Sequence, residues 1–235
     1  MNALAQDPTR SASSPQLQDG PDVQLSLSEI RSLCTRAARG AGFDWGHADE
    51  AGWAAAWLVA AGLPGPSILL GVLQEQRCHG PVPQPGRWVA SGGPVCPLRA
   101  GVALADHCKL PEGPGPAPLV LEQVRFPAFV LPFVARAAGQ LAQGLRIRTG
   151  FLMSTVVKEG LIFEQTDDLG HLPSLADITI TRAMAMHGSP NSHPQSGADV
   201  RLQDWRALDA LALRMTVPPS DLSRNRAGSG GDDND

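Results

Sequence analysis

The sequence predicts an α+β protein in which an N-terminal helical hairpin packs on a mainly antiparallel sheet, with a late C-terminal helix and long Gly- and Pro-rich loops. Apolar residues recur with helical spacing in residues 26–62 and again in residues 200–215. Between residues 145 and 182, apolar and polar residues alternate instead, which is the pattern of half-buried strands. Helices at either end of a run of strands favour an α+β class over an alternating, parallel α/β fold.

The first helix of the hairpin has a start, an apolar stripe and an end. Ser26 and Glu29 have the spacing of a capping box, in which a hydroxyl and a carboxylate satisfy free amides of the first turn. Gly40 and Gly42 follow the last apolar position and predict where the helix ends. The stripe between them consists of residues spaced three and four apart: Ile30, Leu33, Cys34 and Ala37.

The second helix is predicted to begin after Asp44, a good N-cap residue, and to end before Gly62 and Pro64. We expect Trp53 and Trp57 to form its apolar face. Small residues on this helix would let another backbone approach it closely; they are Ala48, Gly52, Ala55 and Ala56.

The segment between the hairpin and the strands has a mixed pattern. Residues 79–97 are rich in proline and glycine and predict a long surface loop that Trp88 anchors. Residues 98–110 fit a helix or a strand, and their Ala-rich middle favours a helix. The other elements expected here are a short helix over residues 68–76, a strand over 119–124 and a buried helix over 126–143 that Pro132 interrupts.

The alternating part of the chain predicts the sheet. Strands are expected over residues 145–149 and 177–182. A hairpin is expected from residues 151–157 and 161–164, with Gly160 taking the positive-φ position of the turn between them. The final helix, over residues 200–215, presents Leu202, Trp205, Leu208, Ala212 and Met215 on one face.

Composition limits the class of protein. A chain of 235 residues that is 43% hydrophobic can bury one sizeable core, which we place in residues 22–222. Residues 1–21 predict a disordered lead-in, and residues 223–235 a Gly/Asp-rich tail. A net charge of −4 without adjacent basic residues argues against nucleic-acid binding. Without an apolar run of about 20 residues, a secretory signal or a dense cysteine framework, we expect a soluble, cytoplasmic protein that does not enter membranes.

Several side chains are candidates for chemistry. Asp106 and His107 are adjacent groups that could move protons. A thiol nucleophile beside them, Cys96 or Cys108, would need a spatial arrangement that the sequence does not show. Cys and His pairs lack the spacing of a metal template, so we predict no metal site. The carboxylates Glu164, Asp167 and Asp168 fit a solvated turn better than an acid/base pair.

A resemblance to a known family rests on several motifs. They are Leu25-Ser26-Leu27-Ser28-Glu29-Ile30, the run from Arg36 to Gly46, Glu50-Ala51-Gly52, Trp57-Leu58, Val217-Pro218, Ser223-Arg224 and Asp233-Asn234-Asp235. In these the sequence resembles a bacterial family of about this length, the domain of unknown function 3726, over residues 25–235. The resemblance implies that the tail is part of the domain. It supplies no substrate, cofactor or catalytic residue.

Two hypotheses of function follow. In the first, the protein is an enzyme, or an enzyme component, that acts on a small polar anionic metabolite. The candidate site then consists of Asp106 and His107, which would transfer protons, and a set of anion-binding residues: Arg36, Arg39, Ser223 and Arg224. In the second, the protein is a non-catalytic binding module or partner subunit of a homo- or hetero-oligomer, and the face with Trp53 and Trp57 is its interface. The cofactor is unknown in both.

Overall fold

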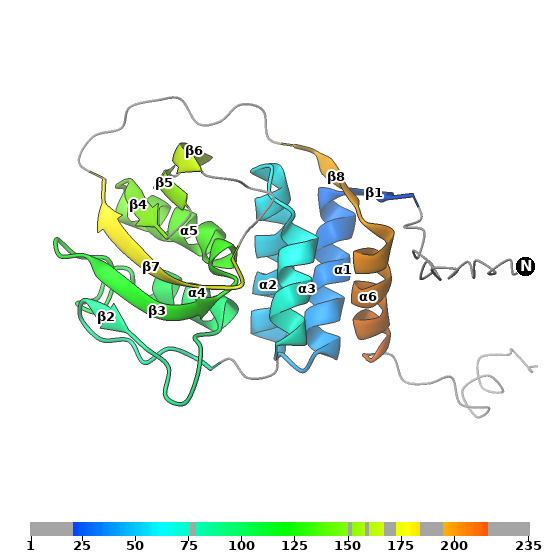
Figure 1. The fold of residues 1–235 in the computed structure, drawn as a ribbon, viewed down its shortest axis with the longest axis horizontal. Helices are drawn as coiled ribbons and strands as arrows, with labels where there is room; N and C mark the ends of the chain where they lie inside the picture. Colours follow the sequence, from blue (N-terminus) through cyan, green and yellow to red (C-terminus); the bar gives the residue numbers. More distant parts are fainter. Residues whose placement is uncertain are drawn as a thin grey trace, which may run out of the picture.

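The computed structural model describes residues 21–75, 79–149, 152–157, 160–166, 173–183 and 195–215. These residues form two parts that lie side by side (Figure 1). One part is a bundle of four helices with a two-stranded sheet at one end, and the other is a six-stranded sheet with two helices on one face. The predicted α+β class is therefore confirmed.

The predicted hairpin consists of helix α1 (Leu27–Gly40) and helix α2 (Trp45–Ala60). The capping box of α1 is confirmed: the Glu29 carboxylate accepts from the Ser26 N–H at 2.8 Å, and the Ser26 hydroxyl accepts from the Glu29 N–H at 3.3 Å. All four residues of the predicted stripe on α1 are buried. The helix ends at a turn in which Gly42 has a φ of +99°, a conformation that favours glycine.

The buried face of α2 differs from the predicted one. Trp53 and Trp57 are only half-buried, whereas mostly small residues form the buried face: Ala48, Ala51, Gly52, Ala54, Ala55, Leu58 and Val59. The physical reason is that α2 contacts α1 on one side and helices from both parts of the molecule on the others. At Gly52 an added methyl carbon would lie 2.6 Å from the Arg31 carbonyl oxygen of α1, so only glycine permits this close approach.

Two further helices complete the bundle, α3 (Gly65–Gln74) and α6 (Leu202–Leu213). Helix α6 packs along α1 (Figure 1). The bundle also has a small sheet that the sequence did not predict, in which β1 (Val23–Ser26) pairs antiparallel with β8 (Gly197–Val200). Four residues are too few to show a strand alternation, which is why the pattern missed both strands.

The larger sheet has the strand order β2-β3-β7-β4-β5-β6. All its neighbouring strands are antiparallel except β2 and β3, which are parallel. The predicted pairing of β5 with β6 is confirmed. The strands are β2 (Arg87–Trp88), β3 (Leu119–Arg125), β4 (Leu145–Arg148), β5 (Leu152–Val157), β6 (Gly160–Thr166) and β7 (Leu175–Arg182).

Helices α4 (Pro97–His107) and α5 (Leu131–Leu141) lie between the hairpin and the larger sheet. The helical alternative for residues 98–110 is thus confirmed. Pro132 does not interrupt a helix as predicted, because a short 3-10 helix (Pro127–Val130) precedes α5 and Pro132 lies in its first turn, where a missing amide costs nothing. Trp88 is fully buried and donates to the Glu112 carbonyl at 2.9 Å, so it anchors its segment as expected.

Residues 1–20 and 216–235 lie outside the described part of the chain, so the predicted lead-in, tail and domain boundaries stay predictions. The polar loop before β8 and the carboxylates Glu164, Asp167 and Asp168 also have no described side chains. Among the described residues, no helix combines the length and the apolar composition needed to cross a membrane.

Candidate functional site

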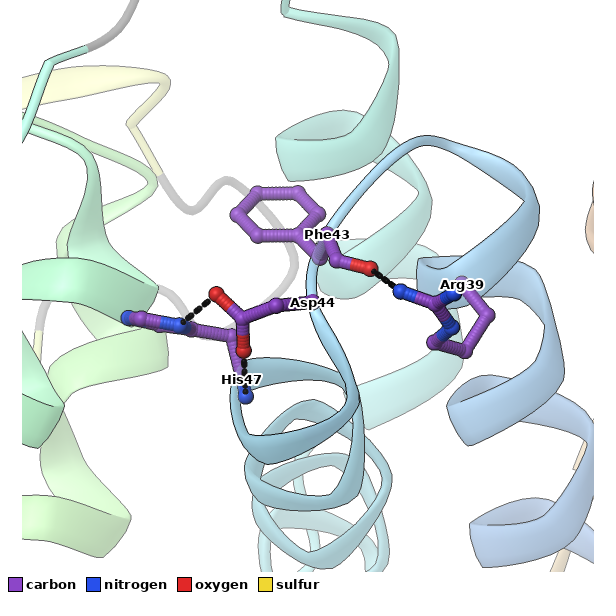
Figure 2. A network of polar contacts seen from close by, with 4 residues as sticks. All are labelled: Arg39, Phe43, Asp44 and His47. Atoms are coloured by element: carbon purple, nitrogen blue, oxygen red, sulfur yellow. Dashed lines mark hydrogen bonds and ion pairs between the residues drawn. The ribbon is translucent and has the colours of Figure 1, made fainter.

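The turn between α1 and α2 is held by a network of polar contacts (Figure 2). The guanidinium of Arg39, near the end of α1, donates to the carbonyl oxygen of Phe43. The same guanidinium lies 4.4 Å from the centre of the Trp45 ring, within the range of a cation–π contact. Arg39, which the sequence suggested as a ligand-binding residue, therefore contacts the turn itself.

Asp44 caps α2 and holds His47 in one orientation. One carboxylate oxygen accepts from the His47 backbone N–H at 2.8 Å, and the other lies 2.7 Å from Nδ1 of its ring (Figure 2). These two bonds, with a smaller contribution from the charge of Arg99, hold the pKa of Asp44 below its ordinary value. The carboxylate is thus ionised at neutral pH. Since Nδ1 faces Asp44, the other ring nitrogen, Nε2, points away from it.

A cleft of about 180 Å³ lies beside this turn. Three elements line it: the turn, the end of α3 and the first turn of α4. Arg99 of α4 connects the cleft to the network of Figure 2, because its guanidinium lies 5.6 Å from the centre of the Phe43 ring. The lining residues are Ala41, Gly42, Phe43, Val72, Leu73, Glu75 and Arg99.

The charges in the cleft are unequal in their pairing. Glu75 lies 3.4 Å from Nε of Arg125, whereas Arg99 makes no ion pair with the described residues. Arg99 is in the first turn of α4, whose N-cap residue, Cys96, makes no side-chain capping bond. The free amides and the helix dipole therefore add positive potential near Arg99. This arrangement is suited to binding a small anion.

Backbone strain lies next to the Glu75–Arg125 pair. Phe126 follows Arg125 and has a φ of +42°, which is rare for a residue with a side chain. Its ring occupies the space above Gly71 of α3, where an added methyl carbon would lie 2.5 Å from the ring. Such strain costs on the order of 1–3 kcal/mol and is frequent near functional sites.

The other site residues predicted from the sequence do not line this cleft. Asp106 is exposed near the end of α4. Nδ1 of His107 lies 2.8 Å from the Ala103 carbonyl oxygen of the same helix, and its ring contacts Trp88 edge-on at 5.9 Å. Arg36 lines a separate groove between α1 and α6. Ser223 and Arg224 lie outside the described residues.

The thiols in the described part of the chain show no activation. Cys108 donates to Oε1 of Gln140 at 2.6 Å, and burial raises the pKa of its thiol. Burial also raises the pKa of the Cys34 thiol to about 12. No group of three His, Cys, Asp or Glu side chains among the described residues could hold a metal ion. Cys78 is not among them.

Sequence patterns missed two parts of the cleft and its surroundings. Asp44 was recognised as a cap, and the His47 at the third helical position was a visible signal for its pairing with that cap. Arg99 had no such signal, because it reaches Phe43 only through the packing of α4 against the hairpin.

The fold and the site define an α+β protein in which a helical hairpin and α4 together form a positively charged cleft. Residues 25–113 match the model of the family described as "Protein of unknown function (DUF3726)", which confirms the family resemblance over these residues. The matched range contains α1 to α4 and therefore the whole lining of the cleft. No curated protein matches the chain. The likeness beyond residue 113 stays a prediction.

Proposed function

We propose that the protein binds a small polar anionic metabolite in the cleft beside the α1–α2 turn. The observation that supports this proposal is that Arg99 lines the cleft without an ion pair to any described residue. An arginine presents two parallel N–H donors to a carboxylate or phosphate, which makes it the preferred partner of such groups.

The dimensions of the cleft limit the ligand. A volume of about 180 Å³ corresponds to roughly six water molecules at about 30 Å³ each, so the ligand is a small organic acid rather than a nucleotide. Glu75 on the far side would repel a second negative charge, and it accepts hydrogen bonds. A hydroxy acid, with its carboxylate at Arg99 and its hydroxyl toward Glu75, fits both groups.

A proton-transfer role for His47 extends this proposal to an enzyme. Asp44 stabilises the protonated imidazole and holds one tautomer, as a carboxylate does for a general acid/base. His47 lies 6.4 Å from Phe43 between ring centres, and Phe43 lines the cleft. In this proposal His47 takes the role that the sequence suggested for Asp106 and His107. A cytoplasmic location in a bacterium belongs to the same proposal.

The alternative, a partner subunit that uses Trp53 and Trp57, has less support. The Trp53 ring packs edge-on against Phe133 at 5.5 Å, and the guanidinium of Arg136 lies 3.8 Å from its centre. Part of this face is thus already covered within the chain. Among the described tryptophans, Trp45 is the exposed one, with 60% of its surface accessible.

The test is a thermal-shift and calorimetric screen with lactate, glycolate and inorganic phosphate. A ligand at 100 times its Kd stabilises the fold by about 2.7 kcal/mol, which raises Tm by about 5–10 °C in a chain of this size. We expect this rise for the unchanged chain and for Arg31→Gln, an exposed control on α1, and no rise for Arg99→Gln. Equal shifts in both variants would contradict the proposal.

A further inference from the structure

A second hollow lies on the other side of the bundle, between α1 and α6, with a volume of about 320 Å³. Its floor is apolar and its rim is polar. The floor consists of Leu25, Leu33 and Trp205, and the rim of Ser28, Glu29, Ser32, Arg36 and Asp209. None of these residues lines the cleft at the α1–α2 turn.

Opposite charges lie at the two ends of this groove. Glu29 and Arg36 are seven positions apart on α1, which places them on one face of the helix about 10 Å from each other along its axis. Leu33 lies between them on the same face and forms part of the floor. The groove thus presents a negative end, an apolar middle and a positive end.

The charged groups are available to a ligand. Neither Arg36 nor Asp209 makes an ion pair or a side-chain hydrogen bond with the described residues. Glu29 accepts two bonds from Ser26 through one oxygen, Oε2, and its other oxygen accepts none from the described residues. The bonds from Ser26 also hold the pKa of Glu29 below its ordinary value, so the carboxylate is ionised at neutral pH.

The surroundings of Glu29 leave room for an ammonium group and its water. At Leu25 and Glu29 the groove adjoins a polar hollow of about 660 Å³ over strands β1 and β8. Asp209 adds a second carboxylate to the lining, and Trp205 offers an aromatic ring that attracts cations. No comparable second cation stands beside Arg36 in the lining.

We propose that the α1–α6 groove binds a short ω-amino acid, a zwitterion with its carboxylate at Arg36 and its ammonium at Glu29. The methylene chain of the ligand lies on Leu33, Leu25 and Trp205, where it loses contact with water. A dianion meets Glu29 and Asp209, and a diamine meets Arg36, so the lining selects against both. This site is separate from the cleft of the proposed function.

The test uses three probes that share one five-carbon chain: 5-aminopentanoate, pentanoate and pentylamine. Calorimetry at low salt is expected to show binding of 5-aminopentanoate, with each singly charged probe at least about tenfold weaker, since it lacks one charge-assisted hydrogen bond. Equal affinity for all three probes, or no heat from 5-aminopentanoate at millimolar concentration, overturns the proposal.

Variants assign each end of the ligand. Arg36→Gln should lower the affinity for 5-aminopentanoate to that for pentylamine and leave pentylamine unaffected. Glu29→Gln keeps the capping geometry, since glutamine serves a capping box as well, and should lower the affinity to that for pentanoate. Arg31→Gln and Arg99→Gln should bind 5-aminopentanoate like the unchanged chain. Unaltered binding by Arg36→Gln overturns the proposal, and the Arg99→Gln result separates it from the proposed function.

Discussion

Asp44 combines a structural and an electrostatic role in one side chain. It caps α2 through the backbone N–H of His47 and orients the ring of the same residue. Because both bonds require the ionised carboxylate, they hold its pKa below the ordinary value of an aspartate. The stability of the fold and the protonation of a candidate catalytic group are therefore linked at this residue.

The depressed pKa of Asp44 predicts a pH dependence of stability. The stabilisation by its carboxylate is fully present above the pKa of the unfolded chain and is lost as the pH falls through the lower pKa of the folded chain. Asp44→Asn should thus lower Tm at pH 7, and the gap to the unchanged chain should narrow toward pH 3. Tm measured against pH for both chains checks this; a constant gap contradicts it.

The buried stripe of α1 predicts the effect of a single truncation. Leu33 is 5% exposed, so Leu33→Ala leaves a cavity and should cost about 2–5 kcal/mol of unfolding free energy. Ser32→Ala, at the exposed neighbouring position, should change it by less than about 0.5 kcal/mol. Urea unfolding of both variants measures the difference. Equal midpoints would refute the assignment of the helix face.

At the scale of single residues, the sequence predicts what depends on neighbours in the chain. The caps Ser26 and Asp44 were recognised because a helix start involves residues within one turn. The bond from Arg39 to the Phe43 carbonyl and the position of Arg99 over Phe43 depend on how the chain packs, so no local pattern indicated them.

At the scale of elements, glycines determine how closely the helices pack. A methyl carbon at Gly40 of α1 would lie 1.7 Å from the Leu211 carbonyl oxygen of α6, and one at Gly65 of α3 would lie 2.0 Å from the Ala55 carbonyl oxygen of α2. Backbone atoms cannot move aside without shifting a whole helix. The bundle is therefore intolerant of side chains at these crossings.

This close packing predicts that Gly40→Ala destabilises the protein. The two helices must separate to admit the methyl group, at a cost of roughly 1–3 kcal/mol or more. Gly46→Ala is the matched control, because its nearest contact, an oxygen of Asp44, would be 3.5 Å away. Alanine is a better helix former than glycine, so the control should be neutral or slightly stabilising. Thermal unfolding of the two variants decides; equal losses contradict the prediction.

The elements that the sequence missed are short or depend on long-range pairing. Strands β4 to β7 show an alternation and were predicted. Strand β2 has two residues and pairs with β3 in parallel, and β1 pairs with β8 from the far end of the domain. Patterns of this length carry no period. The face of α2 was mispredicted because tryptophan is the larger apolar residue, while close packing selected the small ones.

At the scale of the molecule, α6 joins the bundle through a polar contact as well as apolar packing. The buried carboxylate of Asp204 accepts from the Ser67 hydroxyl of α3 and from Nη2 of Arg201 at 2.8 Å. Leu208 and Ala212 of α6 are buried in the same core. The bundle is thus complete only when residues 202–213 are present.

The range of the family match therefore does not coincide with a folding unit. Residues 25–113 include α1 to α4 but neither α6 nor the strands β3 to β7. We predict that a fragment of residues 21–113 does not unfold cooperatively, because the apolar faces that α6 and α5 cover become exposed. Circular dichroism during heating, compared with residues 21–215, is the measurement. A sharp transition in the shorter fragment would contradict the prediction.

The pairing of β1 with β8 has a consequence for the order of events during synthesis. Ser26 meets Gly197, and α1, the first helix to be made, is covered by α6, the last described one. Contacts this distant in sequence form slowly, because a long loop must close before they repay its entropy. The nascent chain therefore carries an uncovered apolar helix until nearly all of the domain has been translated. It should depend on chaperones during that interval.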